Sequence, residues 1–147
     1  MTRWQARAGG LQLEAWVNPY RIQAGQTPAL CGASPARLHP DWVRYTDTGA
    51  YLDPASADVR QYIADGVGEL CARYAVDGIH FDDYFYPATE ESIDAAQFAA
   101  SGAADLAAWR RQNVTALVKK VHDTVKTADP TLQGQTHTTT STASTAM

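Results

Sequence analysis

Residues 77–87 hold the side chains whose types and spacing are best suited to chemistry. This segment is Asp-Gly-Ile-His-Phe-Asp-Asp-Tyr-Phe-Tyr-Pro, an apolar run that ends in two adjacent carboxylates, Asp82 and Asp83, and then three aromatic residues. The run over residues 79–81 is typical of a buried strand. In α/β folds the carboxyl ends of strands gather ligand-binding and catalytic side chains. Carboxylates beside aromatic rings suit a sugar, so the segment predicts a carbohydrate site.

Glycosidic hydrolysis needs two carboxyl groups, roughly 5–5.5 Å apart for retention of configuration and 6.5–9.5 Å for inversion. Asp82 and Asp83 are adjacent, and neighbouring strand residues point to opposite faces, so they are not expected to form that pair. The apolar residues Ile79 and Phe81 suit a helix layer, which places His80 and Asp82 on the other face. By fold analogy with amylase-type glycosidases, Asp82 is our first catalytic candidate. Asp83 is the second.

Each candidate also has a structural alternative. Asp82 could instead cap the next loop or pair with an arginine, and Asp83 could cap a helix or orient a neighbour. Asn18 ends the preceding strand and could bind a sugar hydroxyl, or simply form an Asn-Pro turn. Arg21 could pair with a substrate carboxylate, with Asp82, or with a structural partner. His80 suits an interior, hydrogen-bonded position as well as a site. The residues predicted to bind substrate are Asn18, Tyr20, Arg21, His80, Tyr84 and Tyr86.

Composition bounds the class of protein. The 147 residues are 45% apolar and 19% charged, enough for one globular domain with a core. The net charge of −4, with no Lys or Arg between Arg73 and Arg110, gives no support to a nucleic-acid partner. No apolar run approaches the roughly 20 residues of a membrane span, and residues 1–10 lack the apolar core of a signal peptide. The spacing of His80 and the carboxylates specifies no metal site, and we predict no cofactor.

The elements that must position these residues follow from periodicity. Alternation over residues 11–17 predicts a strand, while residues 22–51, rich in Gly, Pro and Ala, predict a long loop that packs down in part. Asp53-Pro54 predicts the N-cap and first position of a helix. In that helix Gly66 and Gly68 would permit close approach to a sheet.

The second half of the chain predicts a strand over residues 77–81 and two helices. Thr89 is placed as the cap of a short helix that ends near Phe98, and a longer helix covers residues 103–126 and stops at Asp129-Pro130. Strands that alternate with helices predict parallel βα units. Two strands cannot close a barrel of eight, so we expect the chain to be a fragment that is incomplete at both ends. Residues 133–147 form a polar, low-complexity tail that is expected to be disordered.

Four segments together resemble a known family. They are residues 13–21 (LEAWVNPYR), residues 51–54 (YLDP) with Val59-Arg60, residues 77–87, and residues 109–114 (WRRQNV) with Leu117-Val118. They look like the glycosyl hydrolase-like ten family, bacterial envelope enzymes with a TIM-barrel catalytic domain. The resemblance implies an α/β fold, a partial TIM (β/α)8 barrel over residues 1–132 that is incomplete at both ends.

The resemblance also implies an activity. The parent protein is expected to hydrolyse glycosidic bonds of a bacterial polysaccharide, with peptidoglycan glycan strands as the expected substrate, and to be exported to the cell envelope. The family's continuation after the long helix is replaced here by the polar tail. The alternatives are therefore a non-catalytic carbohydrate-binding fragment or an inactive truncation product. Unpaired strand edges of an incomplete barrel favour self-association.

Overall fold

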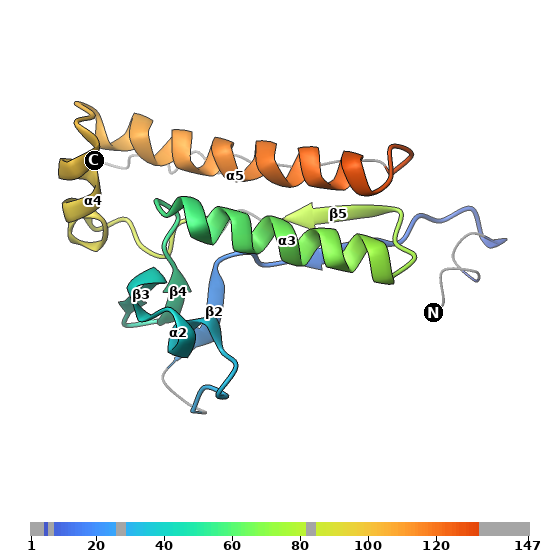
Figure 1. Ribbon diagram of the computed structural model, residues 1–147, viewed down its shortest axis with the longest axis horizontal. Coiled ribbons are helices and arrows are strands. Elements are labelled where there is room, and N and C mark those ends of the chain that lie inside the picture. The colour runs from blue at the N-terminus through green and yellow to red at the C-terminus, as the bar shows by residue number, and fades with distance from the viewer. Residues whose placement is uncertain (1–4, 6–7, 26–28, 82–84, 133–147) are drawn as a thin grey trace, which may run out of the picture.

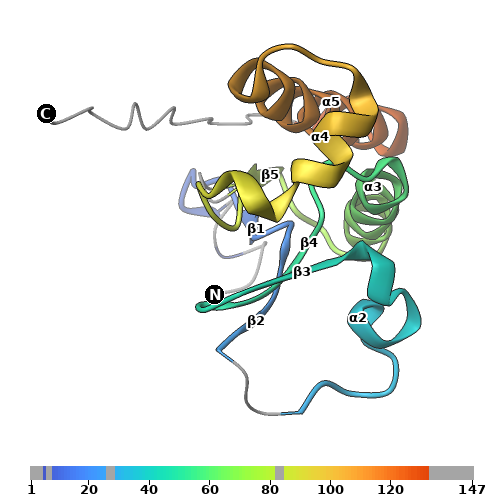
Figure 2. The ribbon, with the colours of Figure 1, turned by 90° about the vertical axis from the view of Figure 1, so that its left-hand side faces the viewer.

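The computed structural model describes residue 5 and residues 8–25, 29–81 and 85–132. Its centre is a two-layer unit. Strands β1 (Glu14–Val17) and β5 (Gly78–Phe81) pair in parallel, with Glu14 opposite Gly78 and Val17 opposite Phe81. Helices α3 (Ala57–Arg73) and α5 (Leu106–Ala128) lie side by side over one face of this pair (Figures 1 and 2). The chain is therefore a mixed α/β structure with a parallel strand pair, as its periodicity predicts.

The main core lies between the strand pair and the two helices. Ile79 and Phe81 are 3% and 2% exposed and belong to one cluster with the buried faces of both helices. This confirms that the apolar residues of β5 face the helix layer. The helix residues in that cluster follow helical spacing: Val59, Ile63, Ala64, Val67, Leu117, Val121 and Val125.

A small antiparallel sheet is inserted between β1 and α3. Strands β2 (Arg21–Ala24), β4 (Gly49–Leu52) and β3 (Val43–Thr46) pair in that order, and α2 (Pro35–Leu38) and the 3-10 turn η1 (Pro40–Trp42) connect them. The prediction of a long loop over residues 22–51 was therefore wrong. Each strand has only four residues, too few to show a period. Gly49 has a φ of 152°, and a Cβ there would lie 2.0 Å from the carbonyl oxygen of Gln23.

Helix α3 begins later than its sequence predicts. Its N-cap is Ser56, whose Oγ accepts a hydrogen bond from the backbone N–H of Val59 at 3.3 Å. Asp53 is buried and serves other partners, so its prediction as the cap was wrong. The prediction for the two helical glycines also fails: Gly66 faces open space, and a Cβ on Gly68 would meet Thr124 of α5, not a sheet.

The segment after β5 forms the 3-10 turn η2 (Glu91–Ile93) and helix α4 (Ala95–Ser101) before α5. Thr89 is not a helix cap, because α4 starts only after Asp94. Asp105 caps α5 by accepting from the N–H of Ala108 at 2.9 Å, and Asp129 ends the helix as predicted. None of the helices in the described ranges has the length and apolar character needed to cross a membrane. The predicted tail, residues 133–147, lies outside the described residues.

Candidate functional site

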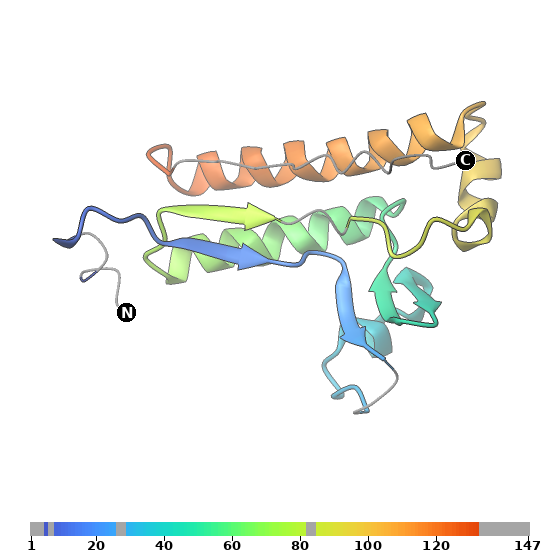
Figure 3. The ribbon, with the colours of Figure 1, turned by 180° about the vertical axis from the view of Figure 1, so that it is seen from behind.

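The carboxyl ends of β1 and β5 meet at one edge of the parallel pair, since Val17 lies opposite Phe81. Asn18 follows β1 there, and the two catalytic candidates follow β5 in the sequence. Figure 3 shows that both strands point toward the small antiparallel sheet and α4. Asp82, Asp83 and Tyr84 lie outside the described residues, so their roles stay predictions.

Glu14, Trp16 and His80 share the sheet face that points away from the helices. Trp16 lies opposite His80, and His80 Nδ1 is 3.9 Å from Glu14 Oε2. Trp16 is 69% exposed, so none of the described elements covers its side chain. His80 thus faces away from the helix layer, as alternation predicts. Glu14 is a further carboxylate on this face that our sequence analysis did not single out, although its alternation with Ala15 could have found it.

The three candidates after β1, Asn18, Tyr20 and Arg21, take part in a turn, in the core and in the start of β2. Asn18 Oδ1 accepts a hydrogen bond from the backbone N–H of Arg21 at 3.3 Å, which is the turn role given above as its alternative. Arg21 is exposed and starts β2. Tyr20 is 0% exposed in the core, and its hydroxyl has no hydrogen-bond partner among the described residues. Burial raises the pKa of Tyr20, and its predicted contact with a substrate stays a prediction.

Tyr86 is half-buried on the segment after β5, and two side chains of α5 hold it. The Arg110 guanidinium lies over its ring, 5.2 Å from the centroid. Asn113 Nδ2 donates to its hydroxyl at 3.4 Å. Burial raises the pKa of Tyr86 to about 12. Of the predicted aromatic pair, this is the member that the structure describes.

Arg110 ties residues 89–94 to α5. Its Nε and Nη2 donate to the two carboxylate oxygens of Asp94 at 2.9 and 2.7 Å, a bidentate ion pair with Asp94 almost fully buried. Nη1 donates to the carbonyl of Thr89 at 3.0 Å and Nη2 to that of Glu90 at 2.8 Å. The ion pair and the two carbonyl contacts together anchor the loop beside the candidate site.

Asp53 connects β3, α4 and the turn before α3 at the same end of the molecule. It is 3% exposed, and its Oδ2 accepts hydrogen bonds from Arg44 Nη2 of β3 and from Gln97 Nε2 of α4, the latter at 3.2 Å. Its Oδ1 accepts from the N–H of Ala55 at 2.9 Å. Burial is the largest influence and raises the pKa of the Asp53 carboxyl. Sequence reasoning missed this role because Asp-Pro is also a common helix start.

An open groove lies between the β3–β4 hairpin and the segment after β5. Residues 44–48 line one side, and residues 86–90 with Ser92 and Ile93 line the other, around a volume of about 860 Å³. The bidentate ion pair of Arg110 lies behind the second wall, and Asp53 holds Arg44 in the first. The groove therefore has two walls that are fixed from behind by buried charged groups.

The chain matches the family model described as Glycosyl hydrolase-like 10 over residues 4–141. It belongs to this family. Glycosyl hydrolase YngK of Bacillus subtilis strain 168 is 40% identical over 128 residues, which cover 82% of this chain and 25% of YngK. Glycosyl hydrolase DigH of Escherichia coli strain K12 is 34% identical over 140 residues, which cover 86% of this chain and 32% of DigH. The chain thus spans about a quarter to a third of the length of these relatives.

A solved structure shares the fold of this glycosyl hydrolase-like chain. The GH36 α-galactosidase AgaA from Geobacillus stearothermophilus, in complex with raffinose, gives a TM-score of 0.50 at 17% identity. The match covers 88% of this chain and 17% of AgaA. Identity this low shows likeness of fold alone.

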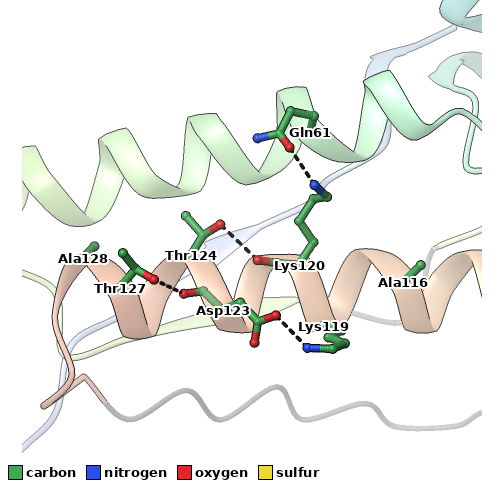
Figure 4. A pocket seen from close by; sticks show the side chains of 8 residues that line it. All are labelled: Gln61, Ala116, Lys119, Lys120, Asp123, Thr124, Thr127 and Ala128. Atoms are coloured by element: carbon green, nitrogen blue, oxygen red, sulfur yellow. Dashed lines mark hydrogen bonds and ion pairs between the residues drawn. The ribbon is translucent and has the colours of Figure 1, made fainter.

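A second hollow lies on the helix layer, between α3 and α5 (Figure 4). Lys120 Nζ donates to Gln61 Oε1 across the two helices at 2.6 Å, and Lys119 pairs with Asp123 at 2.7 Å. The first contact joins the two helices and the second lies within α5, so the polar side chains of the hollow have a structural explanation. Within the described ranges, no three His, Cys, Asp or Glu side chains gather in a way that could hold a metal ion.

Proposed function

We propose that this chain is part of a TIM (β/α)8-barrel O-glycosyl hydrolase that cleaves a bacterial polysaccharide, with peptidoglycan glycan strands as substrate. The observation that carries the proposal is the parallel β1–β5 pair in a glycosyl hydrolase-like chain, with the adjacent carboxylates directly after β5. The apolar face of the pair packs on helices, and the other face carries Glu14 and His80. A barrel has this division between its outer and inner faces.

In the proposed mechanism Asp82 supplies one of the two carboxyl groups that glycosidic hydrolysis needs. One group protonates the leaving oxygen while the other acts as nucleophile or as base toward water. The partner of Asp82 comes from another strand of the barrel, because neighbouring residues of an extended chain point to opposite faces and the adjacent Asp83 is therefore not expected to be that partner. Asp83 then orients the strand end or the loop that follows.

The test is the release of new reducing ends from peptide-free peptidoglycan strands by the polypeptide that carries these residues. Asp82→Asn keeps the shape of the side chain and removes its charge, so the rate should fall at least about a hundredfold. Asp41→Asn is the matched control, because Asp41 is exposed on η1, and it should hydrolyse at the wild-type rate. Wild-type turnover by Asp82→Asn would remove Asp82 from catalysis.

The second candidate function is carbohydrate binding without catalysis. The groove between the β3–β4 hairpin and residues 86–93 favours it, since its walls carry the tyrosines Tyr45 and Tyr86. Retention of glycan strands by the wild-type polypeptide, with no new reducing ends over a long incubation, would select this function. Export of the parent to the cell envelope and self-association through strand edges remain predictions.

A further inference from the structure

We propose that the groove between the β3–β4 hairpin and residues 86–93 binds an uncharged sugar ring of the polysaccharide. The inference rests on the proposed function for the identity of the polymer. The groove proposal adds to the proposed function the place where one sugar ring lies and the charge of that ring. In peptidoglycan glycan, an uncharged N-acetylhexosamine alternates with one that carries a lactyl carboxylate, so the groove would select the first.

The groove is close to the candidate catalytic carboxylate. Tyr86 follows Asp82 by four residues, so their Cα atoms can be no more than about 14 Å apart. The groove also lies on the side of the molecule toward which β1 and β5 point (Figure 3). Neighbouring rings of one glycan chain can therefore occupy the groove and the strand ends together.

Aromatic rings on both walls suit the flat face of a pyranose. Tyr45 is 69% exposed on the hairpin wall. Tyr86 on the opposite wall is held in place by the Arg110 guanidinium over its ring and by Asn113 at its hydroxyl. A fixed aromatic ring gives contact area with little loss of side-chain entropy when a ligand binds.

Hydroxyl groups on the hairpin match the hydrogen-bonding needs of a sugar. Thr46 Oγ1 and Thr48 Oγ1 are 2.9 Å apart, and Thr48 Oγ1 is 3.1 Å from the hydroxyl of Tyr51. Each hydroxyl has one proton to donate and two lone pairs, so the group can donate to or accept from sugar hydroxyls. Thr46 and Thr48 both line the groove.

The charges of the groove argue for an uncharged ring. Asp47 on the hairpin and Glu90 on the opposite wall are exposed carboxylates that would repel a lactyl carboxylate. Arg44 is the one cation among the described lining residues. Its guanidinium is already engaged by the buried carboxylate of Asp53 and by the carbonyl of Val43 at 3.1 Å. An anionic ligand in the groove would therefore be repelled by two carboxylates, and the guanidinium of Arg44 is already bound to other groups.

The test measures binding of two tetrasaccharides to the full chain with Asp82→Asn, so that cleavage does not interfere. One is the uncharged β-1,4-linked tetramer of N-acetylglucosamine, and the other carries lactyl groups on alternate rings. Tyr45→Ala should weaken binding of the uncharged tetramer roughly tenfold, which corresponds to about 1.4 kcal/mol. Tyr45→Phe, which keeps the ring, should retain most of the affinity.

Tyr74→Ala is the matched control, because Tyr74 is 66% exposed at the end of α3 and does not line the groove. It should bind like the parent variant. Equal affinities for the alanine variants of Tyr45 and Tyr74, or tighter binding of the lactyl tetramer, would overturn the inference. A chain without near-UV aromatic ellipticity would also count against it, since the groove exists only in the folded state.

The two proposals fail separately. If Asp82→Asn abolishes release of reducing ends and Tyr45→Ala binds like the Tyr74 control, the groove assignment is wrong and the hydrolase stands. If the tetramer binds through Tyr45 and no reducing ends appear with unsubstituted Asp82, the hydrolase is wrong and the groove remains a sugar site.

Discussion

Arg110 shows how a single residue can organise the surroundings of the candidate site. Its guanidinium donates four hydrogen bonds, to both oxygens of Asp94 and to two backbone carbonyls of the loop after β5. Lysine cannot make these forked contacts, so Arg110→Lys should lower the free energy of unfolding by about 1–3 kcal/mol. Urea denaturation measures the change. Arg111→Lys, an exposed neighbour on the same helix, should stay within about 0.5 kcal/mol of wild type, and an equal loss in both variants would contradict the role of Arg110.

At the residue scale, the sequence predicts what depends on alternation and misses what depends on distant partners. The positions of Ile79 and Phe81 toward the helices and of His80 on the opposite face follow from the two-residue period of a strand. The roles of Asp53 and Arg110 do not, because Asp53 meets a partner 44 residues away and Arg110 one 16 residues away. Local spacing therefore presented Asp53 as a helix cap and hid its burial.

At the scale of elements, the contact between α3 and α5 gives a paired test of two glycines. Gly66 faces open space, so Gly66→Ala should raise the free energy of unfolding by about 0.5–1 kcal/mol through helix propensity alone. A Cβ on Gly68 would lie 3.0 Å from Thr124 Cγ2 of α5. Gly68→Ala should therefore gain less than Gly66→Ala or lose stability. Thermal denaturation compares them, and equal stabilisation would mean that the helices are farther apart than described.

The same scale explains why the long helices were predictable and the inserted sheet was not. Helices α3 and α5 have 17 and 23 residues, enough turns for a buried stripe to appear in the sequence. Strands β2, β3 and β4 have four residues each and are half-exposed in places, so their pattern is too short to recognise. Their pairing depends on contacts such as that of Gly49 with Gln23, which local sequence does not reveal.

For the whole molecule, the β1–β5 sheet separates the helices and the main core on one face from the polar candidate residues on the other face. Helices α3 and α5 lie on one side of the β1–β5 pair (Figure 2), with the core between them and the strands. Glu14, Trp16 and His80 lie on the opposite face of the sheet. The strand ends, the small sheet and α4 meet at one end, where the groove lies. Sequence periodicity could predict the first division, because it is a property of each strand. It could not predict the groove, which two segments about 40 residues apart form together.

The whole fold should also be sensitive to high pH through its buried tyrosines. Burial raises the pKa of Tyr20 and that of Tyr86 above the ordinary value of 10.0, the latter to about 12. Above pH 10 the unfolded chain loses these protons while the folded chain keeps them, so stability falls as pH rises, by up to about 1.4 kcal/mol per pH unit for each tyrosine. Tyr20→Phe removes a buried hydroxyl that has no hydrogen-bond partner in the described part of the chain. It should match or exceed wild-type stability at pH 7 and lose less between pH 10 and 12, as urea midpoints across this range would show. Tyr74→Phe, at an exposed position, should follow the wild-type curve, and a Tyr20→Phe curve that also follows it would mean that the Tyr20 hydroxyl is not buried in solution.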